Sequence, residues 1–431
     1  MNEAVARGDL KTAYKRIRET NPLLGTTARC CPQLSSLCES ACALQWVGHP
    51  VAIGMIQRAV ADWERLEQTQ PPPARSESSG KKIAIVGAGP AGLGAAELLT
   101  RYGHSATIYE ELQHSGGTAW YGIPDYHLPK DVLDYEVEKI VQSGVEIKNG
   151  VKIGRDLTLS ELLEEGYGAV IVATGCKDIV ALDTPGKELS GVYEGYTFLE
   201  DVYVNGVDAY LKNPTYKLGK ETLVIGGGDS ALDAARTALR LTGGKVTLVY
   251  RRTEKEMPAD SLVVEEAKEE GVDFKFLAAP RSFNGSDGRL TSVTMITMEL
   301  GPPDASGRRS PQPVPGRDFE MICDSVIVSV GRGPNSFLQK KENLKTGKNN
   351  SIAINEHYET SIPRVFAAGD VTSGETLVVK ALQSGRQAAQ RVHESLSGLE
   401  GKHVSLYQEY FSHRRYPRLF SSSPKAPLPP P

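Results

Sequence analysis

The chain lacks a long hydrophobic run: no uninterrupted apolar stretch approaches the roughly 20 residues that a transmembrane helix needs. A secretory signal is not expected either, because the opening stretch, MNEAVARGDLKTAYKRIRET, is charged throughout. A strong excess of one charge is missing too, since the formal net charge is −4, and this gives no reason to expect nucleic acid as a partner. These absences predict a protein of the cytoplasm whose partners include neither a membrane nor a nucleic acid.

Cysteine is scarce and unevenly distributed. Cys176 and Cys323 lie alone beside apolar runs, and we expect them to be core residues. In a chain without a secretory signal, a cysteine cluster favours a metal site over a disulfide framework. The remaining four of the six cysteines form such a cluster and are the candidate metal ligands: Cys30, Cys31, Cys38 and Cys42.

What is present is the composition of a soluble globular protein, with 40% hydrophobic and 24% charged residues. A length of 431 residues allows about three domains. Apolar residues at helical spacing predict an opening helix within residues 2–20 and a second helix from Pro50 to about Leu66, with the loop-like cysteine segment between them. The Pro- and Ser-rich stretch 67–80 reads as a linker.

From Lys81 onward, short β-branched runs alternate with helical stretches, which predicts a parallel sheet covered by helices. Strands are expected at 82–86, 106–110, 169–173, 222–225, 246–250, 325–329 and 365–368, and an antiparallel hairpin within 290–325. The predicted domains are a helical domain at 1–66, a discontinuous first nucleotide-binding domain at 81–205 and 325–398, a second one at 206–324, and a disordered tail at 399–431.

A glycine-rich loop, Gly87-Ala88-Gly89-Pro90-Ala91-Gly92, directly follows the first of these strands. Glycines in a strand–turn–helix unit let the backbone approach a pyrophosphate, whose charge sits at the positive end of the following helix. Glu110 ends the next strand about 20 residues further on, where a carboxylate grips ribose hydroxyls and repels a 2′-phosphate. The alternative is a turn whose glycines serve packing only. The whole context favours a dinucleotide site.

Other residues point to FAD as this dinucleotide. Asp370 follows a strand that ends in Gly369 and could hold a hydroxyl of the ribityl chain, although an ordinary helix N-cap or turn residue is an equally good reading. The helix expected from Thr376 to Val392 could aim its positive end at the flavin ring and stabilise charge that develops on reduction. The remaining candidate FAD contacts are Gly116, Gly117, Thr174 and Gly175.

A second loop, Gly226-Gly227-Gly228-Asp229-Ser230-Ala231, follows the strand at 222–225. Where an acid would normally stand in this unit, the chain has Arg251 and Arg252, and the guanidinium fork matches the 2′-phosphate of NADPH. The alternative is a solvated basic pair. Gly331 closes the strand at 325–329 much as Gly175 does in the first unit, which suggests a crossing between domains. NADPH is therefore favoured over NADH.

Together these elements predict an α/β fold with two Rossmann-like domains, arranged as in glutathione reductase, behind a small helical domain that carries the cysteines. Two dinucleotides in one chain point to hydride transfer from a nicotinamide to a flavin, which needs no acid or base from the protein. No Cys-x-x-Cys pair lies near either loop, so a dithiol relay is not expected.

As a set, the motifs resemble the small (beta) subunit of NADPH-dependent glutamate synthase, whose relatives include the flavin domains of dihydropyrimidine dehydrogenase and of ferredoxin–NADP transhydrogenases. The resemblance covers about residues 8 to 395. Besides the two loops, it is carried by Thr20-Asn21-Pro22, Cys31-Pro32-Gln33, Cys38-Glu39-Ser40-Ala41-Cys42, Pro50-Val51-Ala52-Ile53-Gly54, Gly122-Ile123-Pro124, Leu128-Pro129-Lys130, Tyr250-Arg251-Arg252, Met257-Pro258-Ala259, the hairpin from Glu299 to Arg309 and Ala368-Gly369-Asp370.

The resemblance implies an enzyme that passes electrons from NADPH to FAD and then, through iron–sulfur clusters, to a large synthase subunit that forms glutamate from glutamine and 2-oxoglutarate. It equally allows an electron-input subunit of a pyrimidine dehydrogenase or of a ferredoxin–NADP transhydrogenase, with another acceptor protein as partner. A reading of a different class is a redox-sensing module whose nucleotide sites do not turn over.

The chain departs from the family pattern in its cysteines. Thr27 stands where the family usually has a cysteine, and the family's earlier cysteine motif is not seen ahead of the opening helix. Four thiolates are the usual complement of one [4Fe–4S] cluster, so Cys30 would have to join Cys31, Cys38 and Cys42. The alternatives are free thiols in a vestigial motif or a missing N-terminal segment. His127 also replaces the usual basic residue and is either a surface histidine or a flavin contact.

Overall fold

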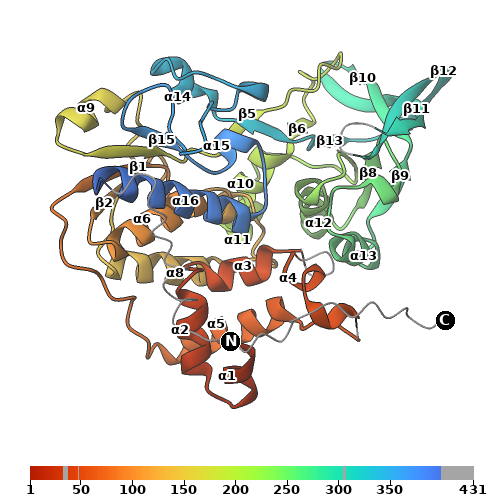
Figure 1. The fold of residues 1–431 in the computed structure, drawn as a ribbon. Helices are drawn as coiled ribbons and strands as arrows, with labels where there is room; N and C mark the ends of the chain where they lie inside the picture. The colour runs from red at the N-terminus through yellow and green to blue at the C-terminus, as the bar shows by residue number, and fades with distance from the viewer. Residues whose placement is uncertain (33–36, 47, 304–306, 399–431) are drawn as a thin grey trace.

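Figure 1 shows the protein as a computed structural model that describes residues 1–32, 37–46, 48–303 and 307–398. A small unit of helices, red to orange, lies beneath two larger units that each contain a parallel sheet. The predicted fold class is confirmed. The tail predicted at 399–431 lies outside the described residues. Within the described part of the chain, no helix is long and apolar enough to cross a membrane.

The N-terminal unit packs its helices around a small core that includes Ala13, Leu24 and Val60. The opening helix, predicted as one, is broken in two at Gly8, whose φ of +73° is a left-handed conformation that suits glycine. The cysteine segment, predicted as loop, is partly helical. The elements are α1 (Asn2–Ala6), α2 (Leu10–Arg18), α3 (Leu24–Cys30), α4 (Leu37–Ser40), a 3₁₀ turn (Ala43–Trp46) and α5 (Ile53–Glu67).

The first nucleotide-binding domain is built on a parallel sheet with the strand order β15-β4-β1-β2-β3. Its strands are β1 (Lys82–Val86), β2 (Ser105–Glu110), β3 (Glu146–Asn149), β4 (Ala169–Val172) and β15 (Val365–Ala367). Its helices are α6 (Pro90–Arg101), α7 (Thr118–Tyr121), α8 (Lys130–Gln142), α9 (Leu159–Glu164), α14 (Ser336–Lys341), α15 (Asp370–Ser373) and α16 (Val378–Leu396), with a 3₁₀ turn at Lys348–Asn350.

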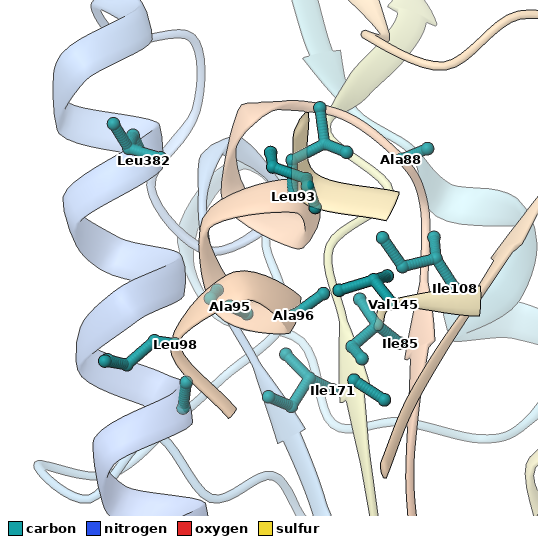
Figure 2. Packing of buried hydrophobic residues seen from close by; sticks show 14 of the residues in the cluster. Ile85, Ala88, Leu93, Ala95, Ala96, Leu98, Ile108, Val145, Ile171 and Leu382 are labelled. Atoms are coloured by element: carbon teal, nitrogen blue, oxygen red, sulfur yellow. The ribbon is translucent and has the colours of Figure 1, made fainter. Parts of the chain in front are cut away.

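Helix α6 is the centre of the largest apolar cluster. Figure 2 shows α6 between the sheet and α16: Leu93 and Ala96 lie on the side of the sheet residues Ile85 and Ile171, and Leu382 projects from α16. Small residues on α6, such as Ala95, allow the helices to approach closely, and a Cβ at Gly94 would lie 2.4 Å from Leu382. This packing fixes α6, and with it the loop that precedes it, against the sheet.

The second domain has a parallel sheet of its own, with the order β6-β13-β7-β8-β9. Its elements are β6 (Val192–Glu194), α10 (Gly195–Asn205), α11 (Val207–Lys212), β7 (Glu221–Ile225), α12 (Asp229–Thr242), β8 (Lys245–Tyr250), a 3₁₀ turn (Glu254–Glu256), α13 (Ser261–Glu270), β9 (Asp273–Phe276) and β13 (Ser325–Val328). The predicted boundaries at 206 and 324 are wrong at both ends, because β13 pairs in parallel with β7 on one side and with β6 on the other.

An antiparallel sheet is appended to the second domain, as the alternating pattern predicted. It consists of β10 (Ala278–Ser286), β11 (Arg289–Pro303) and β12 (Arg309–Ile322). The predicted crossing between domains is a two-stranded ribbon, in which β5 (Cys176–Ile179) pairs with β14 (Arg332–Pro334). All seven strands predicted from the sequence are present, each within one residue of its expected limits.

The stretch predicted as a linker is an extended connection that lies against the first domain. The N–H of Ser76 donates to the carbonyl of Arg101 at 3.0 Å, and the N–H of Ser79 donates to that of Gly103 at 3.0 Å. The Ser79 hydroxyl also lies 2.6 Å from Nδ1 of His104, whose Nε2 is 2.9 Å from Nδ1 of His393 on α16. The connection is therefore tied down at the end of α6.

His104 makes the stability of the fold dependent on pH. Burial, followed by the nearby His393 and Lys81, lowers the pKa of His104 to about 4, against about 6.5 in an unfolded chain. Between pH 6.5 and pH 4, His104 is protonated in the unfolded state but stays neutral in the folded state. The free energy of unfolding therefore falls as the pH falls. We expect a loss of about 1 to 2 kcal/mol between pH 7 and pH 5. Unfolding at both pH values checks this, and His104→Gln should reduce the difference.

Candidate functional site

A cleft of about 1620 Å³ lies where the two nucleotide-binding domains and the N-terminal unit meet. Both glycine loops line it, as do the residues that follow strands β2, β4, β8 and β13. The carboxyl ends of parallel strands are where α/β folds bind their ligands. The cleft also receives residues of α3 and of the N-terminal end of α16. Predicted sites that are far apart in the sequence therefore share one space.

The glycines of the first loop lie in close contact with the protein's own backbone, which leaves no room for side chains, while the predicted approach to a pyrophosphate stays a prediction. Gly87 has a φ of +107°, and a Cβ there would lie 2.5 Å from the carbonyl oxygen of Ala173. A Cβ at Gly92 would lie only 1.9 Å from the carbonyl oxygen of Gly87. Helix α6 begins at Pro90 with Gly89 as its N-cap, and no side chain caps it. The free N–H groups at this helix end can receive a pyrophosphate.

Glu110 is buried behind the same loop. Its Oε2 accepts from the N–H of Ala88 at 2.7 Å, and its Oε1 accepts from the N–H of Leu112 at 2.9 Å. Burial raises the pKa of Glu110, while these two donors act in the opposite direction. Each carboxylate oxygen has room for a second donor, so the predicted ribose contact stays compatible with this geometry.

The other predicted flavin contacts surround the loop. The N–H of Gly116 donates to the carbonyl of Ala88 at 2.8 Å, and a Cβ at Gly117 would lie 3.0 Å from the Cα of Gly89. Thr174 and Gly175 line the cleft, and the Thr174 hydroxyl is buried without a hydrogen-bond partner. A buried hydroxyl that lacks a partner fits a polar ligand in this part of the cleft. The residues present therefore fit a bound dinucleotide.

Asp370 opens the short helix α15 and lines the cleft. Its Oδ1 accepts from the Thr376 hydroxyl at 2.7 Å, and Gly369 before it has a φ of +75°. Burial raises the pKa of Asp370, and the bond to Thr376 acts against this. Gly369 is the N-cap of α15, so Asp370 is not the cap, whereas its bond to Thr376 is compatible with the other alternative, a turn residue. The predicted helix from Thr376 begins at Val378, and its first turn faces the cleft.

The second loop lies close to the residue that follows the neighbouring strand β13. A Cβ at Gly226, whose φ is +156°, would lie 2.2 Å from the carbonyl oxygen of Ser329. Gly228 is the N-cap of α12 and has open space around it, with its nearest atom 3.9 Å from such a Cβ. Asp229 accepts from the N–H of Asp260 at 2.9 Å, Ser230 is exposed, and Ala231 is buried.

The two arginines after β8 lie in different surroundings, although the sequence treats them as a pair. Arg251 is exposed and lines the cleft. Arg252 is buried, and its Nε donates to the carbonyl of Arg309 on β12 at 2.7 Å. Gly331, with a φ of +105°, lies at the cleft just before the crossing strand β14. Both arginines therefore border the cleft, and Arg251 is the more accessible of the two.

The cysteine segment reaches the same cleft. Cys30 and Cys31, at the end of α3, line it, whereas Cys38 on α4 is exposed. Among the described residues no three His, Cys, Asp or Glu side chains lie close enough together to hold a metal ion. Thr27, where the family has a cysteine, is buried and donates to the carbonyl of Leu23 at 2.8 Å. Cys42 is half-buried, and Cys176 and Cys323 are core residues as predicted.

Sequence reasoning missed that Cys30 and Cys31 border the nucleotide cleft. The docking of α3 explains their position: the buried Glu136 on α8 accepts from the N–H and the hydroxyl of Thr26, at 3.0 and 2.7 Å, and from the N–H of Gly25. Thr26 and Glu136 are 110 residues apart in the sequence. A local pattern does not reveal such a contact.

Comparisons with known proteins agree with this geometry. Residues 81–385 match the family described as pyridine nucleotide-disulphide oxidoreductase, and residues 2–69 match dihydropyrimidine dehydrogenase domain II, 4Fe-4S cluster. The glutamate synthase [NADPH] small chain of Halomonas elongata is 34% identical over 91% of this chain and 84% of its own length. The NADP(+)-dependent formate dehydrogenase subunit beta of Moorella thermoacetica is 36% identical over 91% of this chain and 57% of its own.

Among solved structures, FprA of Mycobacterium tuberculosis in complex with NADPH has a TM-score of 0.62 at 20% identity, over 77% of this chain and 89% of its own, which shows a shared fold. The chain spans 57% to 61% of the length of three of its curated relatives. The small chains of glutamate synthase are matched over most of their length. The chain therefore belongs to the pyridine nucleotide-disulphide oxidoreductase family and, within it, to the family of the glutamate synthase small chain.

Proposed function

We propose that this protein is an FAD-dependent enzyme that oxidises NADPH and passes the electrons to a partner subunit, as an electron-input subunit of glutamate synthase type. The observation that carries the proposal is that both phosphate-binding loops, Gly87–Gly92 and Gly226–Ala231, open onto one cleft. When bound there, the nicotinamide supplies a hydride and the flavin accepts it. Two dinucleotides in one cleft can bring these groups together.

The side chains of this protein would bind, orient and shield the cofactors. The first loop and the free N–H groups at the start of α6 would hold the FAD pyrophosphate, with Glu110 behind them. The Thr174 hydroxyl and Asp370 offer polar contacts further into the cleft. The second loop, with Arg251 and Arg252 after β8, would hold NADPH. The N-terminal end of α16 would favour negative charge on a reduced ring.

The partner is proposed from the relatives. The names of the matched glutamate synthase small chains and of the beta subunits of formate dehydrogenase and of NADPH-Fe(3+) oxidoreductase all denote one part of a larger enzyme. We therefore propose a large synthase subunit as the electron acceptor, and another acceptor protein as the alternative. In the first case the final reaction is the formation of glutamate from glutamine and 2-oxoglutarate.

A [4Fe–4S] cluster in the N-terminal unit is supported by the family match at 2–69 but not by the donor set of the described residues. A cubane needs about four thiolates. The Thr27 hydroxyl donates to the carbonyl of Leu23 at the start of α3, and Cys38 is exposed on another helix. The described residues therefore do not supply the complete ligand set of a cluster.

Anaerobic purification followed by an absorption spectrum, flavin release and measurement of iron and acid-labile sulfide tests the proposal. We expect bound FAD that NADPH bleaches, and turnover with an artificial electron acceptor. A chain that binds FAD but does not turn over would favour the redox-sensing reading. Iron and sulfide in equal amounts would establish the cluster that the described side chains do not complete.

Arg251→Ala should weaken NADPH binding by about 10- to 100-fold and leave NADH binding nearly unchanged, because a charge-assisted hydrogen bond to phosphate contributes about 1.5 to 3 kcal/mol. Titration of the purified flavoprotein with both nucleotides measures this. Lys245→Ala, at the exposed far end of the same strand, is the matched control and should change neither affinity. Equal losses for NADPH and NADH would remove the argument for phosphate recognition.

A further inference from the structure

The segment that joins α7 to α8 belongs to the first domain but packs on the second. A Cβ at Gly122 would lie 2.6 Å from the ring of Tyr196 on α10. At the other end of the segment, the Lys130 ammonium is 5.7 Å from the ring centre of Tyr203, also on α10. Lys130 in turn donates to the carbonyl of Ile123 at 2.6 Å, which closes the segment on itself. The segment is therefore a compact contact between the two domains.

Its central residues, Tyr126 and His127, converge on one carboxylate of the second domain. The Tyr126 hydroxyl donates to Oδ1 of Asp233 at 3.2 Å, and Nε2 of His127 lies 3.0 Å from the same oxygen. Asp233 is 7% exposed. Burial raises the pKa of Tyr126 far above its usual range, so its hydroxyl keeps the proton that it donates. His127 is half-buried and also lines the cleft, so the flavin contact considered from the sequence stays a prediction.

Two arginines of α12 complete this contact. The guanidinium carbons of Arg236 and Arg240 lie 4.7 and 4.0 Å from the centre of the Tyr126 ring. Both arginines are held by Glu270 on α13, at 2.5 and 2.7 Å. The Tyr126 ring therefore makes cation–π contacts with two arginines whose positions are fixed, and partial burial strengthens such contacts.

The place of Asp233 on α12 gives the contact its importance. Helix α12 starts at the second phosphate loop, and Asp233 lies one turn, about 6 Å of helix rise, beyond Asp229. Covalently, the two domains are joined only where the chain passes between β5 and β6 and between β13 and β14. Through Tyr126 and His127, Asp233 thus ties the helix that starts at the second loop to the first domain, at the wall of the cleft that both loops line.

We propose that Asp233, held by Tyr126 and His127, is a positioning residue that sets the orientation of the second nucleotide domain on the first and thereby the approach of the nicotinamide to the flavin. The inference rests on the proposed function. Binding of NADPH involves the second domain, but hydride transfer depends on both domains, and small displacements change its rate strongly. The contact should therefore affect the rate more than the affinity.

The experiment compares the wild type with Asp233→Asn, Tyr126→Phe and the double variant, each with FAD bound. Anaerobic single-turnover mixing gives the limiting rate of flavin reduction and the dissociation constant of NADPH separately. We expect the limiting rate to fall by about tenfold or more with less than about a threefold change in the dissociation constant. The double variant should be no slower than Asp233→Asn, because both changes break one contact. Asp208→Asn, an exposed carboxylate on α11, should behave as wild type.

A second readout needs no nucleotide. Hydrogen exchange of β5, β14 and residues 122–130 should accelerate in Asp233→Asn, since the domains would move more freely, and stay unchanged in Asp208→Asn. An unchanged limiting rate, or a loss of rate matched by an equal loss of affinity, would overturn the inference. If Asp233→Asn does not fold, Tyr126→Phe decides, because it removes one hydroxyl only. A wild type that NADPH fails to reduce would instead contradict the proposed function.

Discussion

Gly92→Ala is expected to weaken the binding of the flavin strongly. The new Cβ would lie 1.9 Å from the carbonyl oxygen of Gly87 and 3.2 Å from the side chain of Ile85, so the loop or helix α6 must shift. Because α6 is held between the sheet and α16, the shift falls on the loop, whose N–H groups would no longer face the pyrophosphate. Overpacking of about 1 to 3 kcal/mol corresponds to a loss of FAD affinity of up to about 100-fold.

The ratio of flavin to protein absorbance after incubation with FAD and dialysis measures this loss. Gly226→Ala is the matched variant, because its Cβ would lie 2.2 Å from the carbonyl oxygen of Ser329 and so distorts the second loop alone. It should keep its flavin and lose reduction by NADPH. A Gly92→Ala protein with full flavin content would show that the first loop is not the FAD site.

Glu97→Ala should destabilise the protein by about 3 to 5 kcal/mol, the usual effect of removing one partner from a buried ion pair. The Glu97 side chain on α6 is fully buried, with Arg386 of α16 at 2.7 Å and Arg18 of α2 at 3.5 Å. Without the carboxylate, these two nearly buried guanidinium groups lose the negative charge that they share. Since Arg18 belongs to the N-terminal unit, that unit should also loosen from the first domain.

Denaturant titration gives the loss of unfolding free energy, and limited proteolysis within residues 68–81 reports the loosening. Glu3→Ala is the control, because its ion pair with Arg7 is exposed on both sides and an exposed pair stabilises little. A Glu97→Ala protein as stable as the wild type would mean that the surrounding helices rearrange to hydrate the arginines. In that case Glu97 would not hold the three helices together.

Local sequence patterns predicted the parts of the fold that depend on local interactions. Each glycine loop directly follows a β-branched run and precedes a helix, so strand, turn and helix start are encoded within about 20 residues. The hairpin was equally visible, because alternating residues such as Val293 and Met295 do pack inward on β11. The family resemblance, confirmed by the comparisons, then placed these units in their order.

What the sequence could not predict are contacts between residues far apart. The sequence treats Arg251 and Arg252 as equivalent candidate phosphate ligands. In the structure, however, the Nε of Arg252 donates to the carbonyl of Arg309 on the distant strand β12. The cysteines at the end of α3 reach the cleft only because Glu136 anchors that helix. The domain boundary was misplaced because β13 has the same apolar pattern whichever sheet it joins. A strand can be predicted from its local sequence, whereas the strand with which it pairs depends on the tertiary structure.

The strand order of the first sheet has a consequence for how the protein is made. The outermost strand β15 and the covering helix α16 are translated after the entire second domain, although both complete the structure that β1 and β4 begin. At ordinary elongation speeds, the nascent sheet would wait roughly ten to forty seconds with the edge of β4 unpaired and one side of α6 uncovered. During that interval the ribosome-bound chain is a natural client for a chaperone, whereas the second domain can close as soon as β13 emerges.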